Sequence, residues 1–424
     1  MNPYVRRIVD DELDELFNAL AAIALEGPKG VGKSATALER AATVFEFDRE
    51  EQRNLFDADR HRIERAPGPV LLDEWQRHPP VWDAVRRSVD RDGRGGRFLL
   101  AGSASPVEAP VHSGAGRIVR LRMRPLSLAE RILVQPTVSL AALLEGSKPE
   151  IQGESPIELT EYAEQIVASG FPGIRELPKR ARSVQLDGYL ARIADVEFLE
   201  QGFRVAKPAA FRGWMTAYAA ATSTSASYSS ILDAATPGDT DKPAKTTVLQ
   251  YREMLSRLFL LDPVPGWIPA LNPLSRFAQA PKHHLVDPAL AARLLGLSVE
   301  ALVRGEQGAS SQLPDGALLG SLFESLVALC LRVYAQPISA SVHHLRTQNG
   351  DHEVDFIIEG EDRRVVAMEV KLSPIIEDRD VVHLKWLASR LGTTLADAVV
   401  ITTGMHAYRR PDGIAVVPAA LLGP

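Results

Sequence analysis

The chain has 424 residues, of which 45% are hydrophobic, and its formal net charge is −6. This length exceeds what one hydrophobic core usually spans, so about two or three domains are expected. The acidic balance excludes a general nucleic-acid binder, and any contact with DNA would have to come from a local basic patch.

No targeting or membrane segment is expected. Acidic residues at positions 10–12 precede any apolar region, which argues against a signal peptide. No uncharged apolar run reaches the ~18–20 residues that span a bilayer. A single cysteine, Cys330, lies among apolar residues, so it cannot form a disulfide within the chain and favours burial. We therefore expect a cytoplasmic protein without membrane contact.

The N-terminal third alternates between predicted helices and strands. Most of the strands are continuously apolar, as in parallel sheets whose two faces are covered by helices. The pattern therefore predicts an α/β fold with a parallel sheet. The expected elements are a helix over 11–20, a strand, loop and helix over 22–42, strands over 44–48, 69–74 and 97–103, and an edge strand over 117–122.

The loop after the first apolar strand has the phosphate-binding pattern GxxxxGK[ST]. It consists of Gly27, Pro28, Lys29, Gly30, Val31, Gly32, Lys33 and Ser34. Glycines allow successive backbone N–H groups to turn toward an anion, and the following helix adds the positive end of its dipole. Lys33 would contact the β- and γ-phosphates, and the Ser34 hydroxyl would bind Mg²⁺. The stretch predicts binding of ATP with Mg²⁺.

Two acids, Asp73 and Glu74, follow the second continuously apolar strand. Asp73 would hold Mg²⁺, directly or through water, and Glu74 would polarise the attacking water. Ligands of open α/β sheets bind at the carboxyl ends of the strands, where both acids are expected. Taken alone, this strand would favour a solvated acidic turn, but together with the phosphate-binding loop it favours an ATPase.

Two further residues have open roles at this site. Ser103 follows the next apolar strand and is either a polar sensor near the γ-phosphate or a plain turn residue. Arg117 is either an arginine finger that reaches the phosphate of a neighbouring subunit, which requires self-association, or a surface arginine.

From Pro125 onward the alternation stops and helices predominate. A helix from Thr246 to about Leu258 precedes a short strand at 260–264, which is the order of a winged helix. Few basic residues mark its recognition helix, so a helical packing module without DNA contact remains equally open. Further helices are expected over 128–133, 138–144, 161–169, 187–199 and 211–221.

The C-terminal third combines an apolar helix over 320–334 with several strands. The helix carries one acid, Glu324, which is costly to bury without a partner. Asp355 lies in one strand, and Glu369 and Lys371 lie on one face of the next. Asp355 and Glu369 would bind Mg²⁺ or Mn²⁺, with Lys371 near a scissile phosphate and Glu324 completing the site. A structural network of ion pairs is the other interpretation.

With these motifs assembled, the chain resembles the bacterial AAA-type ATPases that are fused to a C-terminal domain of unknown function with a PD-(D/E)xK nuclease-like fold. The resemblance implies a P-loop ATPase core of the AAA (ASCE) type, a helical and winged-helix middle, and a restriction-endonuclease-like α/β end. Its nuclease pattern falls on Glu324, Asp355, Glu369 and Lys371. The segments that carry it, in family order, are GPKGVGKS, VLLDEWQ, FLLAGSAS, GRIVRLRMRPLSLAE, ASGFPG, Pro281–Lys282, Leu285–Leu290, LFESLV, HEVDFII and MEVK.

The departures from the family pattern lie in the phosphate-binding loop. The family often has a larger polar residue at Gly30 and threonine at Ser34. Neither change removes a phosphate contact, since the backbone N–H and a hydroxyl remain.

The predicted domains are an ATPase domain over 1–135, a helical and winged-helix region over 136–280, and a nuclease-like domain over 281–424. The expected function is Mg²⁺-dependent ATP binding and hydrolysis, coupled to a nuclease-like domain that acts on DNA. The alternative is an ATP-controlled module that binds DNA or a protein partner and cuts neither.

Overall fold

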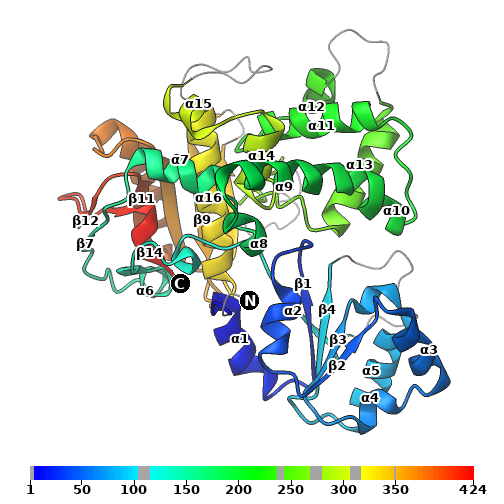
Figure 1. Cartoon of the computed structure of the whole chain (residues 1–424). Coiled ribbons are helices and arrows are strands. Elements are labelled where there is room, and N and C mark those ends of the chain that lie inside the picture. The colour runs from blue at the N-terminus through cyan, green and yellow to red at the C-terminus, as the bar shows by residue number, and fades with distance from the viewer. Residues whose placement is uncertain (1–3, 104–114, 236–242, 268–278, 306–316, 348–349) are drawn as a thin grey trace. The chain divides into compact units, whose positions relative to one another are not determined.

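The computed structural model describes residues 4–103, 115–235, 243–267, 279–305, 317–347 and 350–424 (Figure 1). The chain divides into two compact units. The first unit comprises Met1–Arg124, Ile193–Arg204 and Arg252–Leu260, and the second comprises Pro125–Arg192, Val205–Tyr251 and Leu261–Pro424. This division differs from the three predicted segments, because parts of the predicted helical middle belong to each unit.

The first unit contains a wholly parallel sheet in the order β2-β3-β4-β1-β5. The predicted parallel α/β fold is therefore confirmed for this unit. The three interior strands are buried runs of apolar residues, whereas β2 and β5 alternate because each lies at an edge. The strands are β1 (Ala22–Glu26), β2 (Thr43–Glu46), β3 (Val70–Asp73), β4 (Phe98–Gly102) and β5 (Val119–Arg122).

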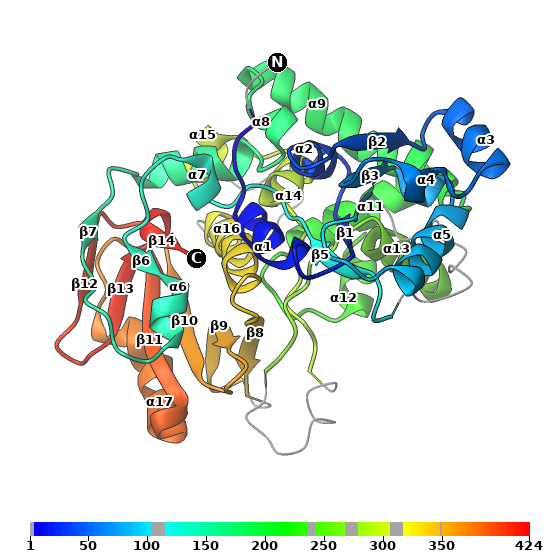
Figure 2. The ribbon, with the colours of Figure 1, turned by 90° about the horizontal axis from the view of Figure 1, so that it is seen from below.

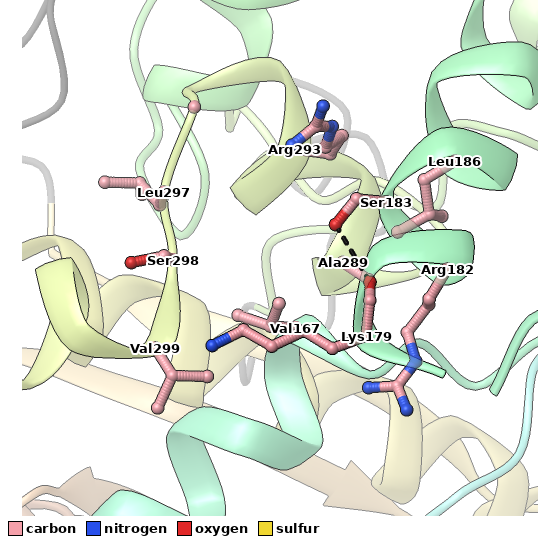
Figure 3. A pocket seen from close by; sticks show the side chains of 11 residues that line it. Val167, Lys179, Arg182, Ser183, Leu186, Ala289, Arg293, Leu297, Ser298 and Val299 are labelled. Atoms are coloured by element: carbon pink, nitrogen blue, oxygen red, sulfur yellow. Dashed lines mark hydrogen bonds between the residues drawn. The ribbon is translucent and has the colours of Figure 1, made fainter. Parts of the chain in front are cut away.

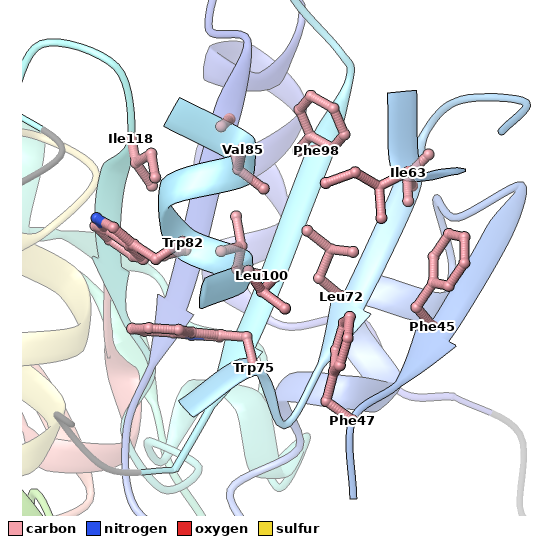
Figure 4. Close-up of a cluster of buried hydrophobic side chains, with 14 of the residues drawn as sticks. Phe45, Phe47, Ile63, Leu72, Trp75, Trp82, Val85, Phe98, Leu100 and Ile118 are labelled. Carbon is pink, nitrogen blue, oxygen red and sulfur yellow. The ribbon is translucent and has the colours of Figure 1, made fainter. Parts of the chain in front are cut away.

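The core of the first unit forms where α5 packs against the sheet. Trp82 and Val85 of α5 belong to the same buried cluster as Leu72 of β3 and Leu100 of β4 (Figure 4). The ring centroids of Trp75 and Trp82 are 4.7 Å apart. The helices of this unit are α1 (Ile8–Phe17), α2 (Lys33–Leu38), α3 (Glu50–Ala58), α4 (Arg62–Arg65), α5 (Pro80–Arg91), a π-helix (Ile193–Glu197) and α10 (Phe198–Glu200).

The second unit contains a mixed seven-stranded sheet in the order β7-β12-β13-β11-β10-β9-β8. The two predicted strands that carry Asp355 and Glu369 are present as β9 and β10, which pair antiparallel. The strands are β7 (Gly153–Glu154), β8 (Ser341–Arg346), β9 (Glu353–Glu359), β10 (Val365–Lys371), β11 (Leu395–Thr402), β12 (His406–Arg409) and β13 (Ala415–Pro418). A separate parallel pair joins β6 (Val138–Ser139) to β14 (Leu422–Gly423).

Helices make up most of the remainder of the second unit. They are α6 (Leu140–Leu144), α7 (Leu159–Val167), α8 (Pro172–Arg175), α9 (Lys179–Arg192), α11 (Pro208–Ala220), α12 (Tyr228–Ala235), α14 (Pro288–Leu294), α15 (Val299–Val303), α16 (Ala317–Ala335) and α17 (Val382–Leu391). α13 (Lys245–Arg257) begins in the second unit and ends in the first.

One helical prediction in this part of the chain was wrong, and a second holds only in part. The predicted helix over 128–133 is only a 3-10 turn at Ala129–Arg131, whereas the predicted helix over 138–144 begins as strand β6 and continues as α6 over Leu140–Leu144. β6 is extended because it pairs with β14, some 280 positions later in the sequence, which local periodicity does not reveal.

After α13 the predicted short strand over 260–264 is present as an extended segment that forms two isolated bridges. Leu261 pairs with Leu285 and Val264 with Lys282, both antiparallel. The order of α11, α13 and this ladder agrees with the predicted order, and α12 is an additional helix that was not predicted; the winged helix itself stays a prediction.

α16 is long and apolar enough to cross a membrane between Leu318 and Ala335, yet 78% of that window is buried inside the structure. It lies along the β8–β9 side of the sheet (Figure 2). The thiol of Cys330 on this helix is buried and accepts a hydrogen bond from the Leu128 backbone N–H at 3.3 Å. α16 therefore has the surroundings of a core helix, and the predicted burial of Cys330 is confirmed.

Candidate functional site

The phosphate-binding loop connects β1 to α2, as predicted. Gly30 and Gly32 have φ angles of 81° and 107°, which side chains rarely adopt. A Cβ on Gly27 would lie 2.3 Å from the backbone oxygen of Met123, so a larger residue does not fit there. The Lys33 ammonium donates to the backbone oxygens of Gly27 and Pro28, each at 2.9 Å. The lysine is thus folded into the centre of the loop.

Burial governs the charge of Lys33. It lowers the pKa of the ammonium to about 8, although the nearby carboxylates of Glu74 and Asp73 favour the charged form. A buried ammonium that is only partly compensated is a strong site for a polyanion, because phosphate oxygens supply the missing negative charge.

The two residues predicted to hold Mg²⁺ are in direct contact. The Ser34 hydroxyl donates to Asp73 Oδ1 at 2.8 Å. Burial raises the pKa of the Asp73 carboxyl, and the hydrogen bond from Ser34 opposes that shift. A hydroxyl and a carboxylate beside a phosphate site match the oxygen ligands that Mg²⁺ accepts together with water and phosphate. The residues present therefore fit Mg²⁺.

Glu74 is held next to the predicted sensor by a residue that the sequence analysis did not single out. Glu74 Oε2 accepts a hydrogen bond from Gln76 Nε2 at 2.8 Å, and the same nitrogen donates to Ser103 Oγ at 3.2 Å. Burial, and then the charge of Asp73, raises the pKa of Glu74. A carboxyl with a raised pKa is better suited to accept a proton from water.

The backbone around Glu74 supports this arrangement. Glu74 has φ 51° and ψ 37°, a left-handed conformation that is uncommon outside glycine and is concentrated at functional sites. Gly102 leaves room for the neighbouring side chains, since a Cβ there would lie 2.7 Å from Trp75 Nε1 and 2.8 Å from Gln76 Oε1. In the sequence, the role of Gln76 could have been suspected from its amide side chain, which lies two positions after Glu74.

Residues 193–204 contribute two ion pairs to the same unit. Lys29 of the loop pairs with Glu197 at 3.0 Å, and Arg77 pairs with Glu200 at 2.9 Å. Glu197 ends a π-helix, a rare element that is frequent at functional sites. Neither acid was predicted as a site residue, because both lie more than a hundred positions from the loop.

Arg117 pairs within its own unit. Its Nε donates to Asp90 Oδ1 on α5 at 2.8 Å. It precedes β5, whose first residue Val119 pairs with Ile23, so Arg117 lies near the amino end of the strands rather than the end that bears the phosphate-binding loop. A role toward a neighbouring subunit stays a prediction.

The predicted C-terminal residues do converge. Met368 pairs with Phe356 across β9 and β10, so the next position along places Asp355 opposite Glu369. Lys371 Nζ donates to Glu369 Oε2 at 2.9 Å. Glu324 of α16 is linked to Asp355 because both carboxylates contact the same lysine.

That lysine is Lys282, whose segment the resemblance included but to which no role was assigned. Its ammonium lies 3.0 Å from Glu324 Oε1, 3.1 Å from Glu353 Oε1 and 2.9 Å from Asp355 Oδ1, and its side chain is 2% exposed. The second oxygen of Asp355 accepts from the Val370 N–H at 2.9 Å. We call Lys282, Glu324, Glu353, Asp355, Glu369 and Lys371 the C-terminal cluster.

The pKa values in this cluster reflect burial and charge. Burial opposes the charge of Lys282, but the three carboxylates overcome it and hold its pKa well above the ordinary value. Burial raises the pKa of Glu324 and of Glu369 to about 8 each. Among the described residues, no group of three or more His, Cys, Asp or Glu side chains is arranged to hold a metal ion. The ligand roles of Asp355 and Glu369 stay predictions.

A pocket with an empty volume of about 540 Å³ lies elsewhere in the second unit, between α7, α9, α14 and α15 (Figure 3). Two of its cations are paired with acids, Lys179 with Glu300 at 2.6 Å and Arg293 Nε with Asp187 at 2.6 Å. None of the predicted site residues lines it, and we assign it no ligand.

Two mycobacterial relatives span nearly the whole chain. They are the uncharacterized proteins Mb2031c of Mycobacterium bovis and Rv2008c of Mycobacterium tuberculosis, each 24% identical over 98% of this chain and 83% of the relative. Neither name states an activity.

Solved structures show only distant likeness. The Walker-type ATPase PABY2304 of Pyrococcus abyssi matches 69% of this chain and 98% of its own, with 15% identity and a TM-score of 0.40. The ORC2 protein of Aeropyrum pernix, in ADPNP–ADP complexes, matches 77% and 96%, with 16% identity and a TM-score of 0.30. The fold assignment rests on the sheet and on the family models instead.

Three family models match separate parts of the chain. Residues 159–301 match a domain of unknown function (DUF8612), and residues 319–422 match another (DUF4143). Residues 20–132 match the AAA domain, and they contain the parallel sheet, the phosphate-binding loop and the Ser34–Asp73 contact described above. The chain therefore carries an AAA-type P-loop ATPase domain.

Proposed function

We propose that this chain is a Mg²⁺-dependent ATP hydrolase. The observation that carries the proposal is the arrangement at the carboxyl ends of three neighbouring strands. Lys33 and Ser34 lie in the segment after β1. Asp73 is the last residue of β3, and Glu74 follows it. Ser103 follows β4, the strand that lies between β3 and β1 in the sheet. Contacts of 2.8 Å join Ser34 to Asp73 and Glu74 to Gln76.

Each residue has a distinct task in hydrolysis. The loop amides and Lys33 bind the β- and γ-phosphates, and Ser34 with Asp73 would hold Mg²⁺, which neutralises phosphate charge when bound. Glu74 orients a water molecule and accepts its proton as the oxygen attacks the γ-phosphorus, so that ADP and phosphate leave. Gln76 positions Glu74 and Ser103, and Ser103 donates toward the γ-phosphate.

The direct test is release of phosphate from ATP by the purified full chain. We expect release with Mg²⁺, none with EDTA, and recovery when Mg²⁺ is restored in excess. Release that continues unchanged in EDTA would contradict the assignment of Ser34 and Asp73.

For the C-terminal domain we propose a nuclease-like fold that binds DNA or a protein partner under ATP control and does not cut. Lys282 favours this function, because its ammonium already joins two carboxylates, Glu324 and Asp355, that the nuclease pattern requires. Metal-dependent cleavage, with Asp355 and Glu369 as ligands of Mg²⁺ or Mn²⁺, is the competing proposal.

A plasmid assay separates these two proposals. Supercoiled plasmid incubated with the full chain, ATP and Mg²⁺ or Mn²⁺ is expected to stay intact, while a gel shift follows the nucleotide state if DNA is the partner. Nicking by the wild type that Asp355→Ala abolishes would establish cleavage. Equal nicking by both proteins would identify a contaminating nuclease.

A further inference from the structure

We propose that Lys282 is the resident cation of the C-terminal cluster. Its ammonium group takes the place that a divalent cation would need between Glu324 and Asp355, so the cluster is complete without a metal. This inference is independent of ATP hydrolysis. It supplies the physical basis for the non-cutting C-terminal domain proposed above.

The contacts of Lys282 satisfy its ammonium. An ammonium has three N–H donors and no acceptor. Three carboxylate oxygens, from Glu324, Glu353 and Asp355, lie within 3.1 Å of Nζ. With a side chain that is 2% exposed, Lys282 has its charge compensated by protein rather than by water.

The backbone fixes Lys282 in this place. The N–H and the carbonyl oxygen of Lys282 both bond to Val264, each at 2.9 Å, in the antiparallel ladder that follows α13. Neighbouring His284 is fully buried, and burial, followed by the charges of Arg332 and Lys282, lowers its pKa well below the ordinary value. His284 is therefore neutral, and Lys282 is the cation that this segment supplies to the cluster.

Three of the four carboxylate oxygens of Asp355 and Glu369 already have partners. Asp355 uses Oδ1 for Lys282 and Oδ2 for the Val370 N–H, and Glu369 uses Oε2 for Lys371. Glu369 Oε1 is buried and has no hydrogen-bond partner among the residues that the structure describes. Glu369 Oε1 alone does not make a chelate, because hard cations such as Mg²⁺ and Mn²⁺ require several oxygen ligands in octahedral geometry, and Glu324 Oε1 and Asp355 Oδ1 already lie on Lys282. A divalent cation would have to displace Lys282.

Cation rescue of a lysine variant tests the proposal. In the full chain without nucleotide, Lys282→Met should lower the melting temperature in EDTA by roughly 6–20 °C, because it leaves buried carboxylates uncompensated. Mn²⁺ should restore part of that loss, and calorimetry should detect Mn²⁺ binding to this variant. The wild type should show no stabilisation by Mn²⁺ and no Mn²⁺ binding at the C-terminal cluster.

Arg409→Met is the matched control in the same sheet. Arg409 contacts Asp397 at 2.8 and 2.9 Å, and the Asp397 side chain is 1% exposed. This variant also uncovers a buried carboxylate, but only one, so it should lose stability without rescue by Mn²⁺. Any weak binding of Mn²⁺ at the nucleotide site should be the same in the wild type, Lys282→Met and Arg409→Met, so it does not affect the comparison.

Two results would overturn the proposal. One is stabilisation of the wild type by Mn²⁺ to the same extent as Lys282→Met. The other is binding of Mn²⁺ to the wild type that the substitution Asp355→Asn removes. This second test needs no lysine variant, so it can be made even if Lys282→Met does not fold. A wild type that cuts plasmid but binds no Mn²⁺ at the cluster would refute the non-cutting function and leave the role of Lys282 intact.

Discussion

Glu74→Gln is expected to bind ATP with the affinity of the wild type and to lower kcat by about 10²–10⁴-fold. Glutamine keeps the size of the side chain and accepts a hydrogen bond from Gln76 through its carbonyl oxygen, as Glu74 does at 2.8 Å. It does not accept a proton from the attacking water. Phosphate release measures kcat, and titration calorimetry measures the Kd for Mg-ATP.

Glu39→Gln makes the same chemical change at an exposed position at the end of α2. It should leave both kcat and Kd unchanged, so it controls for the loss of one negative charge. Hydrolysis by Glu74→Gln at the wild-type rate would show that another group activates the water.

Lys33→Ala should raise the Kd for Mg-ATP by about 10²-fold or more. The Lys33 ammonium lies at the centre of the loop, 2.9 Å from the backbone oxygens of Gly27 and Pro28, where it can turn to phosphate oxygens. Hydrogen bonds to charged groups contribute about 1.5–3 kcal/mol each, and two of them account for this loss. Calorimetry with Mg-ATP measures it.

The second lysine of the loop gives a matched comparison. Lys29 pairs with Glu197, and its side chain is 39% exposed. Since the loop binds phosphate through its backbone N–H groups, Lys29→Ala should change the Kd by less than about threefold. Equal losses in the two variants would mean that the general charge of the loop, rather than the placement of Lys33, determines the affinity. Circular dichroism of both variants checks that the fold is kept.

The nucleotide site was predictable because its parts are local. Glycines at fixed spacing and an acid pair that ends an apolar strand each specify their own conformation, and the parallel sheet then brings the strand ends together. The same logic put Asp355 and Glu369 on neighbouring strands, and the antiparallel register of β9 and β10 then places them opposite each other.

The residues that were missed depend on contacts between distant positions. Gln76 matters because Gly102 makes room for it, and Glu197 because residues 193–204 belong to the first unit. Lys282 enters the cluster through its ladder with Val264. Neither periodicity nor motif spacing in the sequence predicts these contacts. Without knowledge of them, a cluster of carboxylates is equally consistent with a metal site and with an ion-pair network.

The burial of Cys330 has a practical consequence for spectroscopy. The only thiol of the chain is inaccessible inside α16 and is bonded to a backbone N–H, so maleimide and nitroxide reagents should not react with it in the folded protein. Cysteines introduced at exposed positions, one in each unit, can therefore be labelled in the native background. Such labelled pairs would report, by fluorescence transfer or electron resonance, whether ATP changes the distance between the two units.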